Sequence, residues 1–288
     1  MQINLFDVPD NDKKIGGGWT FLRNFQKGIS DVKHALNNNG YDVSMACAPT
    51  MVSRDRWDAA KIKPRVLRAD GVPEDCRNRG TGWPRMRDYG KEADLVIYQS
   101  QFSKQTTGRL MKRDGLVISN GVDTSIFTNK GQKEKSFGSP SVVFVHFRSD
   151  PNKRFQEVIE RFRQYKIEHP KAAITFIGDY PKQQIKWHPK KLDFGMLDLV
   201  EGKDWRYLGV VRNRSKLAQI LRSCDYIAYP SFADPCPNTL VEAMACGAKP
   251  LWPNEYGSTI EIMDLFKNGY DFSLKNMVIK YIKCFRDL

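Results

Sequence analysis

The stretch DYIAYPSFADPCPNTLVEAMACGAKPLWP, residues 225–253, contains the local pattern that decides the fold. The segment 225–231 is short and mainly apolar, and turn residues follow it, which predicts a buried strand. Residues 238–246 predict a helix opened by Asn238 as its N-cap. Residues 249–253 predict a second strand. Apolar strands that alternate with helices predict a parallel sheet covered on both faces.

The same alternation runs through most of the chain. The polar segment TNKGQKEKSFGSP (128–140) has no periodicity and is the one predicted linker. Strands are predicted at 3–8, 42–47, 64–70, 94–100, 115–120, 141–147, 172–179 and 205–211. Helices are predicted from Trp19 to Leu36 and at 101–113, 155–165, 213–223, 258–267 and 275–287, from apolar residues spaced by three and four.

The sequence therefore predicts an α/β protein with two Rossmann-like, doubly wound domains that face a cleft. We expect the first domain at 1–127, the linker at 128–140 and the second domain at 141–274. A C-terminal helix at 275–288 is expected to return to the first domain. Ligands of such sheets bind at the carboxyl ends of the strands, so the substrates are expected in the cleft.

The bulk composition narrows the class of protein. The chain has 288 residues, 41% of them hydrophobic, and a net charge of +13. It has no run of about 20 apolar residues and no signal peptide, so we expect a cytoplasmic protein, a location compatible with binding to a membrane surface or with a viral protein in its host. Six scattered cysteines predict reduced thiols, and four dispersed histidines predict no metal site.

The positive charge indicates an anionic partner, which could be nucleic acid, an acidic membrane surface or a phosphorylated substrate. Residues 54–91 hold eleven Lys/Arg against six acids, with Trp57 and Trp83 among them. A plain solvated basic surface would have the same composition.

Three motifs carry residues suited to chemistry. Gly16, Gly17 and Gly18 stand between the first strand and its helix, where the backbone can approach an anion or a sugar hydroxyl. An ordinary βα turn would also explain them. Arg148 and Lys153 follow the strand 141–147, where two cations suit a diphosphate.

The third motif is the most specific. Asp234 lies before the predicted helix at 238–246 and Glu242 lies a turn inside it. Backbone N–H groups of Asn238, Thr239 and Leu240 suit a phosphate, because a helix N-terminus attracts anions. Glu242 suits two ribose hydroxyls.

Together with the segment Asn120-Gly121-Val122-Asp123, these motifs resemble the retaining GT-B glycosyltransferases of family four (glycosyl transferases group 1) over the whole chain. The resemblance implies a nucleotide-diphosphate sugar as donor, no metal and no cofactor. It implies that Glu242 binds the ribose, that Arg148 and Lys153 bind the diphosphate, and that Asp234 faces the transferred sugar. In the family this first acid is usually a glutamate, so the donor sugar stays open.

The resemblance also implies that the N-terminal domain binds the acceptor. Relatives carry a cleft histidine where this chain has Arg68 and Asp70, so Asp70 is the candidate replacement. The candidate acceptor-side basic surface consists of Arg68, Arg77, Arg79, Arg85 and Arg87.

The acceptor is predicted to be a glycan or a lipid-linked carrier. Two alternatives stay open at this point. One is a phage-type enzyme that glycosylates a modified base in DNA and has to extrude that base. The other is a non-catalytic protein that binds a nucleotide or a nucleic acid. No stable protein partner is implied.

Overall fold

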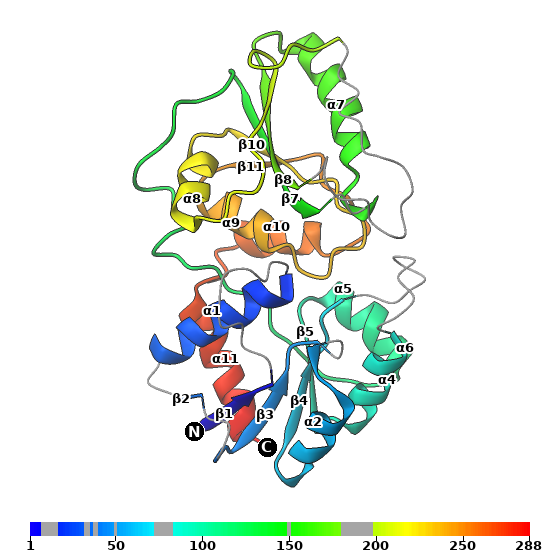
Figure 1. Ribbon diagram of the computed structural model, residues 1–288. Coiled ribbons are helices and arrows are strands. Elements are labelled where there is room, and N and C mark those ends of the chain that lie inside the picture. The colour runs from blue at the N-terminus through cyan, green and yellow to red at the C-terminus, as the bar shows by residue number, and fades with distance from the viewer. Residues whose placement is uncertain are drawn as a thin grey trace. The chain divides into compact units, whose positions relative to one another are not determined.

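The computed structural model describes residues 1–6, 17–31, 35–36, 40–48, 51–71, 83–148, 151–179 and 198–288. The chain divides into two compact units (Figure 1). Unit 1 contains Met1–Asp123, Ala233–Asn238 and Asp264–Leu288, and unit 2 contains Thr124–Phe232 and Thr239–Met263. None of the helices in the described ranges is both long and apolar enough to cross a membrane.

Unit 1 is built on a six-stranded parallel sheet with the strand order β2-β1-β3-β4-β5-β6. The order reverses between β1 and β3, so this pair forms the topological switch point where ligands of open α/β sheets bind. The strands are β1 (Gln2–Leu5), β2 (Ala35–Leu36), β3 (Val43–Ala46), β4 (Arg65–Arg68), β5 (Leu95–Tyr98) and β6 (Leu116–Val117).

Helices cover both faces of this sheet, because successive strand residues point to opposite faces. Val66 and Ile97 pack toward one face, and Leu67 and Val96 toward the other. The helices of unit 1 are α1 (Gly17–Asp31), α2 (Arg54–Ala59), η2 (Ala60–Ile62), α4 (Trp83–Glu92), α5 (Gln101–Ser103), the π-helix η3 (Lys104–Gly108), α6 (Arg109–Met111) and α11 (Leu274–Arg286).

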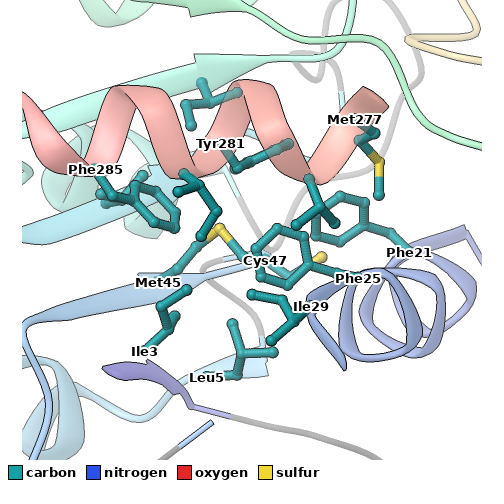
Figure 2. Packing of buried hydrophobic residues seen from close by; sticks show 14 of the residues in the cluster. Ile3, Leu5, Phe21, Phe25, Ile29, Met45, Cys47, Met277, Tyr281 and Phe285 are labelled. Atoms are coloured by element: carbon teal, nitrogen blue, oxygen red, sulfur yellow. The ribbon is translucent and has the colours of Figure 1, made fainter. Parts of the chain in front are cut away.

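One face of unit 1 is covered by helices from opposite ends of the sequence. Figure 2 shows Tyr281 and Phe285 of α11 over the strands and beside Phe25 of α1. The Phe25 and Tyr281 rings meet edge to face with their centroids 5.1 Å apart. Both side chains are fully buried, so α11 completes this layer of the core.

Unit 2 is built on a five-stranded parallel sheet with the order β11-β10-β7-β8-β9, which reverses between β7 and β10. Its strands are β7 (Ser141–Arg148), β8 (Ala173–Asp179), β9 (Trp205–Tyr207), β10 (Tyr226–Ala228) and β11 (Lys249–Leu251). Its helices are η4 (Pro151–Lys153), α7 (Phe155–Glu168), α8 (Arg214–Arg222) and α9 (Asn238–Ala245), and α10 (Thr259–Lys267) leads back to unit 1. Two doubly wound parallel sheets confirm the predicted α/β fold class.

Two differences between prediction and structure concern helices. The helix predicted from Trp19 to Leu36 ends at Asp31, and Leu36 pairs with Ile3 as a short edge strand instead. Apolar spacing continued past the helix, but the backbone there completes the sheet. In addition, α2 and α4 form in a segment, 54–92, for which no helix was predicted.

Candidate functional site

The switch point of unit 1 places the start of α1 beside the end of β4. Gly17 and Gly18 form the first turn of α1, whereas Gly16 lies outside the described residues. A Cβ on Gly18 would lie 2.8 Å from Asp70 Oδ2 and 3.2 Å from Met51 Sδ. Only a glycine therefore lets the first turn of α1 come this close to the Asp70 carboxylate, and the helix N-terminus favours that negative charge.

A hydrogen-bonded network holds the Asp70 carboxylate in place. Gln99 Nε2 donates to Asp70 Oδ1 at 2.8 Å, and Asn120 Nδ2 donates to Gln99 Oε1 at 3.2 Å. Gln99 and Asn120 are buried, while the Asp70 side chain keeps 21% of its surface exposed. The network therefore fixes Asp70 while part of its side chain stays open to solvent.

Arg68 lies beneath this network and not on a surface. Its side chain is fully buried and stacks on Phe21, with the guanidinium carbon 3.8 Å from the ring centroid. Arg68 Nη2 donates to Asn120 Oδ1 at 2.7 Å, and Nη1 lies 3.5 Å from Asp70 Oδ2. The prediction of Arg68 as part of an acceptor-side basic surface is therefore wrong, because its guanidinium is buried and contacts Asn120 and Asp70 inside the unit.

Cys47 completes the buried end of the network. Arg68 Nη1 donates to Cys47 Sγ at 3.3 Å. Burial raises the pKa of the Cys47 thiol to about 12, although Arg68 opposes the shift. Cys47 is therefore a neutral thiol at physiological pH, as expected for a core cysteine.

The rest of the predicted basic surface divides in two. Arg85 and Arg87 are exposed on α4, while Arg77 and Arg79 lie outside the described residues. Trp57 does not belong to a surface, because it is fully buried and stacks on Tyr89 with centroids 4.7 Å apart. The side chain of Trp83 lies outside the described part of the chain.

Acidic groups offset part of the charge in the 54–91 region. Arg54 pairs with Asp58 and with Glu92, and Arg65 lies 3.7 Å from the same Glu92 carboxylate. The composition of this segment therefore overstates its basic surface.

The Asn120-Gly121-Val122-Asp123 segment anchors other elements of unit 1. Gly121 accepts a hydrogen bond from Asn24 on α1 at 3.1 Å, and Asp123 forms an ion pair with Lys27. A Cβ on Gly121 would lie 3.0 Å from Met277 Cβ. The segment thus joins the end of the sheet to α1 and α11.

In unit 2, the loops that follow β7 and β10 flank the second switch point. The Phe232 N–H donates to the Asn152 carbonyl at 2.7 Å, which ties the two loops together. Lys153 lies over the Tyr229 ring, with Nζ 6.0 Å from its centroid. Arg148 is the last residue of β7, and its side chain is outside the described part of the structure.

The loop after β10 leads into α9, which begins at Asn238. Its predicted phosphate-binding groups lie in the first turn, where N–H groups have no partner within the helix. The side chain of Leu240 is fully buried, so this residue can offer a ligand only its backbone N–H group. Within unit 1, Asn238 Oδ1 accepts from Asn120 Nδ2 at 2.8 Å, and Asp234 Oδ1 accepts from the Cys236 N–H at 3.2 Å.

Glu242 lies one turn into α9 and is almost fully buried, with 4% of its side chain exposed. Its Oε1 atom forms a close ion pair with Arg214 Nη2 at the start of α8. Burial raises the pKa of the Glu242 carboxyl, and Arg214 opposes that shift. Arg214 in turn lies over the Phe127 ring, 4.6 Å from its centroid.

Sequence reasoning missed Gln99 and Arg214 as site residues. Gln99 had a usable signal, because it follows the apolar run LVIY at the carboxyl end of its strand, where ligands of parallel sheets bind. Arg214 had none, because it is one of 46 Lys/Arg residues and its partner is 28 positions away.

Two Rossmann-like parallel sheets in one chain are the fold of the GT-B class of glycosyltransferases, to which the structural neighbours belong. The sequence profile described as "Glycosyl transferases group 1" matches residues 127–277, and the chain belongs to this family. It is therefore a glycosyltransferase. Comparison with curated protein sequences finds no similar chain.

Solved structures with the same fold cover nearly the whole chain. Sucrose-phosphate synthase from Thermosynechococcus elongatus is 12% identical, with a TM-score of 0.70 over 99% of this chain and 98% of its own. The Anabaena protein HepE, solved with UDP-glucose, is 14% identical, with a TM-score of 0.69 over 100% of both chains. An alpha-glucosyltransferase solved with UDP-glucose and DNA containing an abasic site is 11% identical, with a TM-score of 0.59 over 87% of this chain and 79% of its own.

Proposed function

We propose that this glycosyltransferase moves a sugar from a nucleotide-diphosphate sugar to an acceptor hydroxyl with retention of the anomeric configuration, and that the acceptor is a glycan or a lipid-linked carrier. The observation that carries the donor assignment is the buried Glu242 carboxylate in the second turn of α9, inside the region that matches the family. The structural relative HepE was solved with UDP-glucose, which supports a donor of this chemical class.

In this proposal Glu242 accepts hydrogen bonds from the donor ribose. Arg148, the last residue of β7, and Lys153, in the turn after that strand, bind the diphosphate. The N–H groups of the first turn of α9, at Asn238, Thr239 and Leu240, bind a phosphate. Asp234 faces the transferred sugar.

We assign the acceptor side to the carboxyl edge of the unit 1 sheet. Asp70 is the candidate catalytic group there, since Gln99 holds one of its oxygens at 2.8 Å while part of the side chain stays exposed. Gly18 lets the first turn of α1 come close to this carboxylate.

The proposed reaction uses no metal and no cofactor. The developing charge on the leaving diphosphate is met by Lys153, Arg148 and the helix N-terminus, which are groups that stabilise such charge in other enzymes. In a front-face reaction the acceptor oxygen forms the new bond to the anomeric carbon, the bond to the diphosphate breaks, and the diphosphate oxygen takes the acceptor proton.

A panel of nucleotide sugars read by thermal shift, followed by transfer assays, tests the proposal. We expect one donor to raise Tm, and proton NMR of the product to show the same anomeric configuration as the donor. An inverted product would exclude the retaining mechanism.

Lys153→Ala should lower kcat by about 100-fold or more, since Lys153 would act mainly on the transition state, with little change in stability. Lys171→Ala is the matched control, because Lys171 is exposed and precedes the amino end of β8, whereas Lys153 follows the carboxyl end of β7. A Lys153→Ala enzyme as fast as the Lys171→Ala enzyme would refute the diphosphate assignment.

A second candidate acceptor is DNA that carries a modified base, and the net charge of +13 favours it. The alpha-glucosyltransferase solved with DNA shares the fold. The test is duplex binding at rising salt: a DNA acceptor predicts an affinity that falls steeply between low and moderate salt, together with transfer to modified bases. Binding to anionic vesicles without binding to duplex DNA would favour the lipid-linked carrier.

A further inference from the structure

The Arg214–Glu242 ion pair joins two helices that follow different strands of unit 2. Arg214 is the first residue of α8, and Glu242 lies in the second turn of α9. The guanidinium approaches Oε1 of the carboxylate, so Oε2 and one lone pair of Oε1 are left for other donors. The Phe127 ring packs against the Arg214 guanidinium and so restricts the orientation of that side chain.

The two partners differ in exposure. Arg214 keeps 40% of its side chain in contact with solvent, while Glu242 keeps 4%. A partly exposed arginine therefore neutralises a buried carboxylate. A carboxylate buried without such a partner would take up a proton, since burial disfavours the charged form.

We propose that Arg214 is a positioning residue for donor recognition, which keeps Glu242 an ionised and oriented carboxylate so that it accepts from both ribose hydroxyls of a nucleoside diphosphate. This inference rests on the proposed role of Glu242 in ribose binding. It adds a residue outside the family motif, and it explains how a carboxyl group that is almost fully buried can stay ionised.

The chemistry requires the ionised form. A carboxylate only accepts hydrogen bonds, which matches the two hydroxyl donors of a ribose, whereas a protonated carboxyl presents an O–H of its own. In the described part of the chain, Arg214 is the titratable side chain that acts on the pKa of Glu242, and Glu242 in turn acts on the pKa of Cys246. Burial raises the pKa of Cys246 to about 11, so this thiol stays neutral over the range of the test.

The test compares ribose with 2′-deoxyribose binding in four proteins: wild type, Arg214→Met, Arg214→Lys and Glu242→Gln. The probe is the nucleoside diphosphate among UDP, GDP and ADP that raises Tm most, together with its 2′-deoxy form, both titrated by calorimetry. Methionine keeps the apolar contact with Phe127 and removes the charge. Urea unfolding of each variant checks that the fold is intact.

We expect wild type to prefer the ribose form by about 10-fold or more, the typical effect of a hydrogen bond to a charged group. Arg214→Met should lose most of this preference at pH 7 and regain it at higher pH. Removing the cation raises the pKa of Glu242 further. The pH at which half of the ribose preference is lost, here called the midpoint, should therefore lie about 1–3 pH units above that of wild type. Arg214→Lys should keep this midpoint near that of wild type, and the binding ratio of Glu242→Gln should not change with pH.

Two failures are distinguishable. If Glu242→Gln binds both probes as wild type does, the proposed ribose contact fails and the inference falls with it. If Glu242→Gln loses the preference while Arg214→Met keeps both the preference and the midpoint of wild type, the ribose contact stands and the role of Arg214 is refuted.

Discussion

Replacing Gly18 by alanine separates the position of Asp70 from the stability of the fold. The added methyl carbon would lie 2.8 Å from Asp70 Oδ2, and ordinary contact begins at 3.4 Å, so the carboxylate has to move by about 0.6 Å. Gln99 holds the other oxygen at 2.8 Å and Arg68 lies 3.5 Å from Oδ2. The movement therefore strains a fixed group rather than a mobile side chain.

The expected change in stability is small because two terms oppose each other. Alanine gains up to ~1 kcal/mol over glycine in a helix. Displacing Asp70 and the Met51 sulfur costs about 1–3 kcal/mol, the usual range for an overfilled site. The net loss of unfolding free energy should be about 0–2 kcal/mol, which leaves the protein folded at 25 °C.

The expected loss of activity is larger. In the proposed reaction Asp70 is the catalytic group of the acceptor side, so a shift of this size should lower kcat/KM by about 10- to 100-fold, because misplacement by 1 Å can cost about 100-fold. Gly17→Ala is the matched control: among the residues that the structure describes, its Cβ would meet Asn238 Nδ2 alone, at 3.9 Å. The assays are urea unfolding and initial rates of transfer. Equal kcat/KM for the two alanine variants would show that transfer does not depend on where the Asp70 carboxylate lies.

Two further substitutions test contacts inside each unit, Asp204→Asn in unit 2 and Gly28→Ala in unit 1. Asp204 accepts from the Val200 N–H at 2.9 Å and pairs with Lys166 at 2.9 Å; burial alone would raise its pKa, but these contacts lower it. The stability it adds is therefore present above pH ~4 and lost as pH falls through the lowered pKa, so Asp204→Asn should cost about 2 kcal/mol at pH 7 and flatten the acid limb of a urea-unfolding series. Equal acid limbs in the two proteins would contradict this. Gly28→Ala would place a Cβ 2.7 Å from Val278 Cγ2 and should lower the unfolding free energy by about 1–3 kcal/mol through the α1–α11 contact; a Tm equal to that of Gly17→Ala would show that this contact yields freely.

The strands were predictable because a strand buried on both faces is a continuous apolar run. LVIY at 95–98 is such a run, and it forms β5. The predicted strand ran on to Ser100, whereas β5 ends at Tyr98 and the chain bends at the next two residues. Gln99 belongs to the Asp70 network, and Ser100 caps α5. Strand ends were thus misplaced where site residues begin.

The burial of two side chains was not predictable from local sequence. Trp57 lies in the charged hexamer RDRWDA, yet its indole is fully buried and donates to Glu92 Oε2 at 3.0 Å. Arg68 reads as a surface cation, yet Asn120, 52 positions away, accepts from it. Contacts between residues so far apart in sequence are set by the order of strands in the sheet, and composition does not encode that order.

The packing of α11 against α1 also sets an order of events during synthesis. Phe25 and Tyr281 share one core layer, so a ribosome adds about 250 residues, including all of unit 2, between the two. At roughly 5–20 residues per second this takes about 12–50 s. Throughout that time the α1 face of the nascent unit 1 sheet lacks the cover that α11 provides, whereas the 124–232 stretch of unit 2 emerges without interruption. Unit 2 can therefore begin to fold first, and chaperones that bind exposed apolar segments should be found on the nascent β1–α1 region until α11 leaves the ribosome.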